Sequence, residues 1–267
     1  MHSEVKKELI NSDPLVSIIT PLFNAQSFIA QTLESIQNQT YSNWELIIVD
    51  DASGDDSVAI VLKAAQDDSR IRLVQHDENK GAAHCRNRAT ELARGDYIAF
   101  LDSDDLWHPE KLEKQITFMQ KNHCEVSYTS YLHIDEQGNS LQKRIIALPS
   151  LSYQKQHRNN YIGNLTGMYN AAILGKIEAP GIRKRQDWAV WLEAIKKSGK
   201  PALGIQEDLA YYRVRKGSIS SNKIDLVKYN FKFYRIYLRY SWGRSALSLL
   251  RFFWEYFLVR PKQIEKL

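Results

Sequence analysis

Cysteine is scarce in this sequence. Cys85 and Cys124 are the only two among 267 residues, and they are too few and too far apart for a disulfide framework or a cysteine-based zinc site. Their scarcity favours a reducing compartment. Residues 1–13 also lack the apolar core that a signal peptide needs. These absences predict a protein that is made and kept in the cytoplasm.

Glycine-rich phosphate loops and long apolar runs are missing too. No G-x-G-x-x-G follows the first expected strand, which argues against a dinucleotide dehydrogenase. Residues 21–24 are not the glycine-rich activating loop that a sugar nucleotidyltransferase needs. The apolar run 246–259 is interrupted by Arg251 and Glu255 and is shorter than a bilayer crossing requires. The sequence therefore predicts no transmembrane helix.

Excess positive charge is confined to one end of the chain. The formal net charge is +5, but residues 222–267 hold ten Lys and Arg against three Asp and Glu. The rest of the chain is slightly acidic, which argues against a nucleic-acid groove. Residues 229–260 mix aromatic and aliphatic side chains with Lys and Arg, a composition expected of helices at an anionic membrane surface. A packed helical tail or a dimer contact is the alternative.

Short apolar runs alternate with helix-period segments through the first hundred residues. This alternation is typical of successive βαβ units on a mostly parallel sheet. Asn24 is expected to cap the first helix, and Gly95 is expected to end the helix that opens at Gly81. The expected strands are 16–20, 44–49, 71–75 and 97–101.

The second half of the chain is less regular. A helix is expected over 109–122 and a strand over 125–134. Another helix begins after Gln186 and ends at Gly199, because apolar residues recur at helical spacing up to that glycine. Residues 139–180 show the weakest pattern.

An acidic run, Asp102-Ser103-Asp104-Asp105, follows the fourth expected strand. Ligands of open α/β sheets bind outside the carboxyl ends of the strands. Several hard oxygen ligands within a few residues suit Mg²⁺ or Mn²⁺ carrying bound phosphates. A solvated acidic turn in which Asp105 caps the next helix is the alternative.

Four motifs occur in one order along the chain: VSIITPLFN (16–24), WELIIVDDAS (44–53), NKGAAHCRNRA (79–89) and GDYIAFLDSDD (95–105). In order and spacing they resemble family 2 glycosyltransferases, and residues 181–221 resemble the bacterial teichuronic-acid-type transferases of surface polysaccharides. The resemblance implies the α/β GT-A fold, a Rossmann-like, mostly parallel sheet flanked by helices. It also implies a catalytic domain at 14–221, with a nucleotide-binding half (14–105) and an acceptor half (106–221). Residues 222–267 would then be a helical, basic and aromatic tail.

The resemblance further implies a site for a UDP-sugar donor. Asp51 would read the uracil, whereas Asp50 would be structural. Asp102 would lie near the ribose and Asp104 on a Mn²⁺ or Mg²⁺ ion, with Asp105 either a second metal ligand or a support. The other implied donor residues are Pro21 and Phe23 beside the base, Asn24, Asn79, Gly81, Arg86 and Ser103. For Phe23, an ordinary core position is the alternative.

A base is needed to take the proton of the acceptor hydroxyl. Inverting members of the family place a Glu-Asp or similar pair at the start of a helix, and Gln186-Asp187 matches this place with Gln replacing Glu. The resemblance therefore implies that Asp187 is the catalytic base. An acid in a first helical turn is also favoured by the helix dipole whatever its function.

Two basic segments could meet anionic groups. The segment that begins at Tyr212 resembles a loop that folds over the donor in relatives, so Arg213, Arg215 and Lys216 are candidates for a lid on the diphosphate. Residues 183–185, Arg-Lys-Arg, could meet an anionic acceptor. A solvated surface run is the alternative for that second segment.

Together these features predict an inverting, metal-dependent glycosyltransferase. It would move a sugar from a UDP-sugar to a hydroxyl of a growing cell-surface polysaccharide or lipid-linked oligosaccharide. It would work in the cytoplasm, on the inner face of the membrane, with homo-oligomerisation left open. A non-catalytic nucleotide-sugar-binding or membrane-adaptor module is the alternative from another class.

Overall fold

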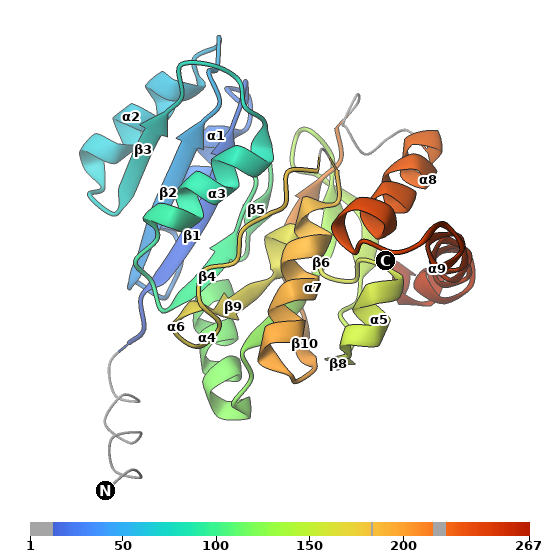
Figure 1. The fold of residues 1–267 in the computed structure, drawn as a ribbon. Coiled ribbons are helices and arrows are strands. Elements are labelled where there is room, and N and C mark those ends of the chain that lie inside the picture. The colour runs from blue at the N-terminus through green and yellow to red at the C-terminus, as the bar shows by residue number, and fades with distance from the viewer. Residues whose placement is uncertain (1–12, 183, 216–222) are drawn as a thin grey trace, which may run out of the picture.

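A computed structural model describes residues 13–182, 184–215 and 223–267 (Figure 1). The expectations for residues 1–12, Arg183 and Lys216 lie outside this described part.

The strands form one sheet in the order β11-β7-β6-β9-β4-β1-β2-β3, and β10 pairs with β5, β6 and β8. Strands β1, β2, β3 and β4 run parallel to one another, and β10 runs parallel to β6. The parallel group therefore falls in the predicted nucleotide-binding half. The strands are β1 (Val16–Leu22), β2 (Trp44–Asp50), β3 (Ile71–Gln75), β4 (Tyr97–Phe100), β5 (Leu106–Trp107), β6 (Val126–Ile134), β7 (Ser140–Ile145), β8 (Ser150–Leu151), β9 (Met168–Asn170), β10 (Ala202–Arg213) and β11 (Ile264–Lys266).

Helices flank this sheet. The α-helices are α1 (Ile29–Gln37), α2 (Ser57–Asp67), α3 (Ala82–Leu92), α4 (Lys111–Asn122), α5 (Tyr153–Arg158), α6 (Ala171–Leu174), α7 (Gln186–Ser198), α8 (Lys223–Lys232) and α9 (Trp242–Trp254). Short helices of other types are η2 (Asn164–Thr166), η3 (Phe233–Tyr237), η4 (Glu255–Val259) and η5 (Arg260–Gln263). The predicted α/β class is confirmed.

The two faces of the sheet are covered by different helices, because neighbouring residues of a strand point to opposite faces. Ile18 of β1 lies in a core with the apolar faces of α1 and α4. Ile19, the next residue, lies in a second core with α3 and α7. In Figure 1, α3 crosses in front of β1 and β2, and α7 lies in front of the other half of the sheet.

Helix α7 lies between the sheet and the C-terminal segment. Trp191 faces the sheet, whereas Trp188 packs against Phe233 and Phe252 from residues 223–267. The rings of Trp188 and Phe233 are stacked, with centroids 4.2 Å apart. The segment is helical as predicted until β11, which pairs antiparallel with β7. None of the described helices is long and apolar enough to cross a bilayer.

Two local expectations were wrong. Asn24 does not cap α1, which begins at Ile29; instead it has a left-handed backbone with φ of 47°. Gly95 does not end α3, whose last residue is Leu92. A side chain at Gly95 would come within 2.6 Å of the backbone nitrogen of Ser17, so this glycine permits the close approach of two chain segments.

Candidate active site

The predicted donor residues gather where β1, β2 and β4 end. Leu22 and Asp50 are paired in register at the ends of β1 and β2. The acidic run, residues 102–105, follows β4, which is the other neighbour of β1. This edge, at the carboxyl ends of parallel strands, is where open α/β sheets bind ligands.

Asp51 fixes the loop that precedes α3. Its carboxylate is buried and accepts hydrogen bonds from the backbone N–H groups of Lys80 at 2.7 Å and Gly81 at 2.9 Å. Asn79 donates to the backbone carbonyl of Asp51 at 3.2 Å. Gly81 has φ of +88°, a conformation that L side chains rarely adopt. Asp51, Asn79 and Gly81 therefore form one unit, and the carboxylate keeps acceptor capacity beyond these two bonds.

Asp50 and Asn24 hold the neighbouring turn together. The Asp50 carboxylate accepts from the backbone N–H and the hydroxyl of Ser53. Ser53 in turn accepts from the backbone N–H of Asn24 at 3.0 Å, and Asn24 accepts from the N–H of Gly54 at 2.9 Å. Asn24 thus links the ends of β1 and β2 through its backbone and side chain.

Pro21 and Phe23 differ in their exposure to solvent. Pro21 is buried within β1, whereas Phe23 just beyond the strand leaves 49% of its surface exposed. The alternative that Phe23 is a core aromatic was wrong. An exposed ring beside the end of the sheet offers a flat apolar surface to a ligand.

Arg86 connects the acidic run to α7. Its guanidinium donates to Asp102 at 2.6 Å and to the side chain of Gln186 at 3.2 Å. Burial opposes the charge, but attraction to Asp102 and Asp187 outweighs it and raises the pKa of Arg86. Arg86 therefore stays protonated and attracts both Asp102, from the first half of the chain, and Asp187, from the second.

Asp104 forms an ion pair with an arginine side chain. Its carboxylate pairs with Arg215 at 2.7 Å, and the guanidinium of Arg215 also lies over the ring of Phe28. Burial raises the pKa of Asp104, repulsion from Asp102 adds to the rise, and Arg215 opposes it. A pair of close carboxylates whose negative charge is costly is a setting that a divalent cation would stabilise.

Asp105 connects the acidic run to β10. It is buried and accepts a hydrogen bond from the backbone N–H of Arg213 at 2.9 Å. Burial raises its pKa well above the ordinary value, and Asp104 and Asp102 raise it further. The alternative that it caps the next helix was wrong, because α4 begins only at Lys111.

Arg213 differs from the expectation of a lid residue. It is the last residue of β10 and is 2% exposed. Its guanidinium donates to the backbone carbonyls of Asp104, Asp135 and Glu136 and to the side chain of Gln31. Since these acceptors hold it inside the fold, Arg213 fastens the acidic run to β10 and the turn after β6. Of the candidate lid cations, only Arg215 faces a site carboxylate in the part of the chain that the structure describes.

Asp187 lies in the first turn of α7, as predicted. Its carboxylate accepts a hydrogen bond from Asn160 at 2.7 Å. Its negative charge acts on Arg86 and on Arg185, whose left-handed backbone precedes the helix. Arg185 itself donates to Asn230 at 2.7 Å, so it joins α7 to α8.

Two site residues were not predicted. Asn160 orients Asp187, and Asn164 reaches Asp102 at 3.4 Å. Both come from the irregular stretch 139–180, where no periodicity or motif marks them. The sequence offered only their position between the expected strand 125–134 and the helix that begins after Gln186.

Another group of possible metal ligands lies beneath the donor site. Among the described residues, Asp51, His76 and Cys85 are the one set of three such side chains whose ligand atoms lie within 4.8 Å of one another. Burial raises the pKa of the Cys85 thiol to about 12, which disfavours the thiolate form that binds a metal ion. The Asp51 carboxylate also holds the loop before α3 through the N–H groups of Lys80 and Gly81. These three side chains are therefore a poor metal site.

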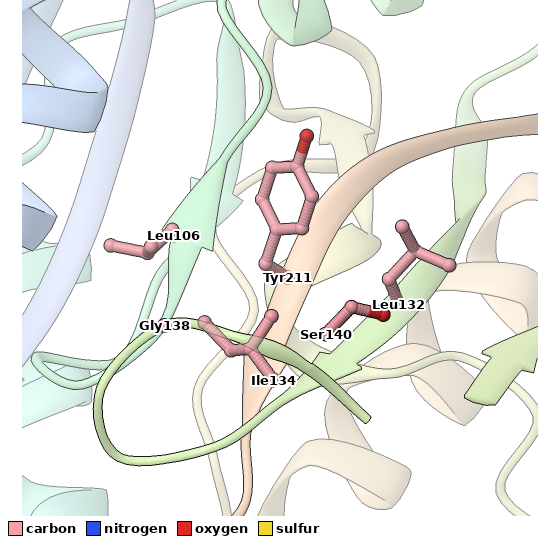
Figure 2. A pocket seen from close by; sticks show the side chains of 6 residues that line it. All are labelled: Leu106, Leu132, Ile134, Gly138, Ser140 and Tyr211. Atoms are coloured by element: carbon pink, nitrogen blue, oxygen red, sulfur yellow. The ribbon is translucent and has the colours of Figure 1, made fainter. Parts of the chain in front are cut away.

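An apolar hollow lies beside this site and not within it. Figure 2 shows Leu106, Leu132, Ile134 and Tyr211 around a volume of about 200 Å³, with Gly138 and Ser140 completing the lining. Charged side chains do not line it. The hollow therefore lacks the groups needed to bind a diphosphate.

The sequence profile of glycosyl transferase family 2 matches residues 17–179, which span every donor residue described above. This chain is a family 2 glycosyltransferase. Among its relatives, TuaG of Bacillus subtilis, assigned to teichuronic acid biosynthesis, is 45% identical over 85% of this chain and 90% of TuaG. The predicted resemblance to family 2 and to teichuronic-acid-type transferases is confirmed.

A second relative of this glycosyltransferase is WfgD of Escherichia coli, a UDP-Glc:α-D-GlcNAc-diphosphoundecaprenol β-1,3-glucosyltransferase. It is 39% identical over 81% of this chain and 83% of WfgD.

Solved structures confirm the GT-A fold of the glycosyltransferase. S. aureus TarS in complex with UDP-GlcNAc superposes with a TM-score of 0.72 at 20% identity, covering 92% of this chain and 74% of TarS. The mannosyltransferase PcManGT of Pyrobaculum calidifontis, in complex with GDP-Man and Mn²⁺, has a TM-score of 0.66 at 19% identity, covering 95% of this chain and 72% of that one.

Proposed function

We propose that this glycosyltransferase moves a sugar, with inversion, from a UDP-sugar to a hydroxyl of a growing cell-surface polysaccharide or lipid-linked oligosaccharide. The observation that carries the proposal is the pair of contacts from Arg86 to Asp102 and to Gln186, the neighbour of Asp187. They bring the donor-side carboxylates and the candidate base to one point. The diphosphoundecaprenol acceptor of WfgD supports a lipid-linked acceptor here.

The donor nucleotide would lie across the ends of β1 and β2. The exposed ring of Phe23 would stack on the uracil. Asp51 would accept from the N–H of the base, and its bonds to Lys80 and Gly81 keep the carboxylate in place for this contact. The complexes of TarS with UDP-GlcNAc and UDP support a uridine nucleotide.

The acidic run fits a divalent cation. Asp104 would be its main protein ligand, with Asp102 contacting the ribose and Ser103 lying between them, while Asp105 stays bonded to the backbone of β10. Carboxylate oxygens suit Mn²⁺ and Mg²⁺ equally. When bound, such an ion would neutralise the charge of the departing diphosphate. Arg215 would turn from Asp104 toward the same phosphates, with Lys216 following it in the chain.

Asp187 would act as the base. The acceptor oxygen attacks the anomeric carbon, its proton passes to the Asp187 carboxylate, and the bond from that carbon to the diphosphate breaks to release UDP. A single displacement of this kind inverts the configuration. The hydrogen bond from Asn160 holds one carboxylate oxygen of Asp187, and the other oxygen would take the proton.

Residues 14–221 would form the catalytic domain and 222–267 its tail. A lipid-linked acceptor would require work at the inner face of the cell membrane, so we place the enzyme there as a peripheral protein. Its tail carries the excess of Lys and Arg suited to anionic lipids.

Release of UDP from a panel of UDP-sugars, measured with Mn²⁺ and with EDTA, tests this function. We expect turnover on at least one UDP-sugar with a suitable acceptor, and its loss in EDTA. Arg88→Gln provides a matched control for Arg86→Gln, since Arg88 lies on the same helix and pairs with Glu91 instead of a site residue. Binding of a UDP-sugar without any release of UDP would favour the non-catalytic adaptor.

A further inference from the structure

Helix α9 exposes apolar side chains along one side. Leu247, Leu250 and Trp254 of α9 are followed, three and four residues after Trp254, by Phe257 and Leu258 of η4, which continues the helix. All five leave 49–65% of their surfaces exposed. Trp242, at the start of α9, is 70% exposed. We call these six residues of α9 and η4 the outer face. Isolated exposed apolar residues are ordinary in proteins, but a set of this size within one helical segment is typical of an interaction surface.

The opposite side of α9 is already packed on the protein. Ser245, Ser248, Phe252 and Glu255 are buried, and Phe252 packs against Trp188 of α7. The carboxylate of Glu255 is bonded to Lys155 and to the hydroxyl of Tyr161. Because this side anchors the helix, the outer face cannot turn inward without breaking the buried contacts.

The charge around the outer face has one sign. Residues 227–263 contain eight Lys and Arg and a single acid, Glu255. Six of the cations are exposed, whereas Glu255 is 2% exposed and neutralised by Lys155. The surface of this segment therefore presents apolar side chains and positive charge without any negative charge to balance it.

Exposed apolar side chains together with unbalanced positive charge favour one kind of binding partner over another. A second copy of the chain meeting the same face about a twofold axis would bring two identical sets of cations, with Arg244 and Arg251 in each, into one interface, and like charges repel. A lipid surface that carries anionic headgroups complements both properties, because Trp, Phe and Leu side chains enter the boundary of the acyl region while Arg side chains stay at the phosphates.

We infer that the outer face of α9 binds in the plane of an anionic lipid bilayer and fixes the orientation of the active site toward it. Trp188, which contacts Phe252 of α9, directly follows Asp187 in α7. The lipid-bound helix and the candidate base thus belong to one packed unit. The role in orienting the active site rests on the proposed function, since it matters only if the acceptor is lipid-linked. Binding of the outer face to lipid does not depend on that function.

Sedimentation with vesicles tests the inference on the full chain without nucleotide sugar. We expect binding to vesicles of phosphatidylcholine with 30% phosphatidylglycerol and little binding to pure phosphatidylcholine. Leu250→Gln combined with Phe257→Gln should reduce binding at least tenfold. Arg244→Gln with Arg251→Gln should reduce it about 25-fold, since each surface cation contributes about fivefold.

Matched controls keep the test specific. Leu62 on α2 and Ile173 on α6 are exposed to 47% and 65%, so Leu62→Gln with Ile173→Gln removes comparable apolar surface elsewhere and should leave binding unchanged. Equal binding to both vesicle types, or equal binding by all variants, would overturn the inference. So would a dimer in analytical ultracentrifugation that the α9 variants abolish. Sugar transfer to a soluble acceptor, measured as UDP release without vesicles, tests the proposed function separately from lipid binding.

Discussion

Arg86 sets the electrostatics of the active site at the scale of single residues. Its buried guanidinium faces Asp102 directly and Asp187 through space. Opposite charges at this separation attract one another. Arg86 therefore holds the two sides of the site together.

Replacing Asp187 by Asn tests its role. The amide keeps an oxygen to accept from Asn160, but it cannot take the acceptor proton. We expect kcat to fall about 100- to 10,000-fold, the usual contribution of a positioned base, while calorimetry shows unchanged UDP binding. Glu193→Gln, farther along α7, should keep normal turnover. Near-normal turnover by Asp187→Asn would remove Asp187 from the mechanism.

Asp105 predicts a pH-dependent stability. Burial, with repulsion from Asp104, raises its pKa in the folded state, so the ionised form costs folding free energy. Its stabilising contribution is full below the ordinary pKa of 3.8 and is lost as the pH rises through the folded-state pKa. Asp105→Asn should therefore raise the Tm at pH 8 by several degrees in EDTA, and the gain should shrink as the pH falls toward 4. A wild type that melts higher at every pH would contradict this explanation.

The donor residues could be predicted because each lies in a motif that follows a strand. Asp51, Arg86 and Asp102 are examples. Asn160 and Asn164 could not be, since the fold alone brings them there from a stretch without periodicity. Arg213 was expected in a lid because the segment that begins at Tyr212 resembles one, but its guanidinium donates to backbone carbonyls that come together only in the folded chain.

At the scale of elements, α4 contains a lysine that the fold has excluded from water. Lys111 is fully buried, donates to Gln115 at 2.8 Å and lies over the ring of Trp107. Burial lowers its pKa from 10.5 to about 7. Between these two pH values the unfolded chain binds a proton that the folded chain does not, so stability increases with pH.

Lys111→Met should abolish that increase. The difference in unfolding free energy between wild type and variant should change by up to about 1.4 kcal/mol per pH unit between pH 7 and 10, measured by urea denaturation. The variant should have its largest advantage at the lower pH. Lys114→Met, one turn along and partly exposed, should follow the wild-type profile, and a parallel profile for Lys111→Met would refute the buried-lysine account.

Elements with strong periodicity were predicted closely. Strand β3 was expected at 71–75 and has those bounds, and α7 ends at Gly199, whose φ of 66° closes the helix. Residues 139–180 were not resolved into elements because every element there is short: β7 and α5 have six residues each, and β8, η2, β9 and α6 have two to four. Such short pieces are stabilised by tertiary contacts and leave no period in the sequence.

At the scale of the whole molecule, residues 223–267 belong to the packed structure. Helix α7 is apolar on two sides, one for the sheet and one for Phe233, Tyr234 and Phe252. The packed helical tail is therefore observed, and the proposed membrane contact would use the opposite, exposed side of α9.

Phe233→Ala tests how strongly this packing contributes. The ring is fully buried and stacked on Trp188, so its removal should lower the free energy of unfolding by about 3–5 kcal/mol, measured by urea denaturation. Phe257→Ala, at a ring that is 64% exposed, should change it by less than about 0.5 kcal/mol. Equal effects of the two variants would show that the segment contributes little to the core.

The pairing of β11 with β7 has a consequence for synthesis on the ribosome. Ile264 pairs with Ile145, so β7 emerges about 120 residues before the strand that covers its edge. At about 5–20 residues per second, that edge waits roughly 6–24 seconds. Lys143 and Arg144 lie on β7, and charged residues at an open strand edge discourage pairing with other chains. We therefore expect these two cations to discourage aggregation of the nascent chain until β11 arrives.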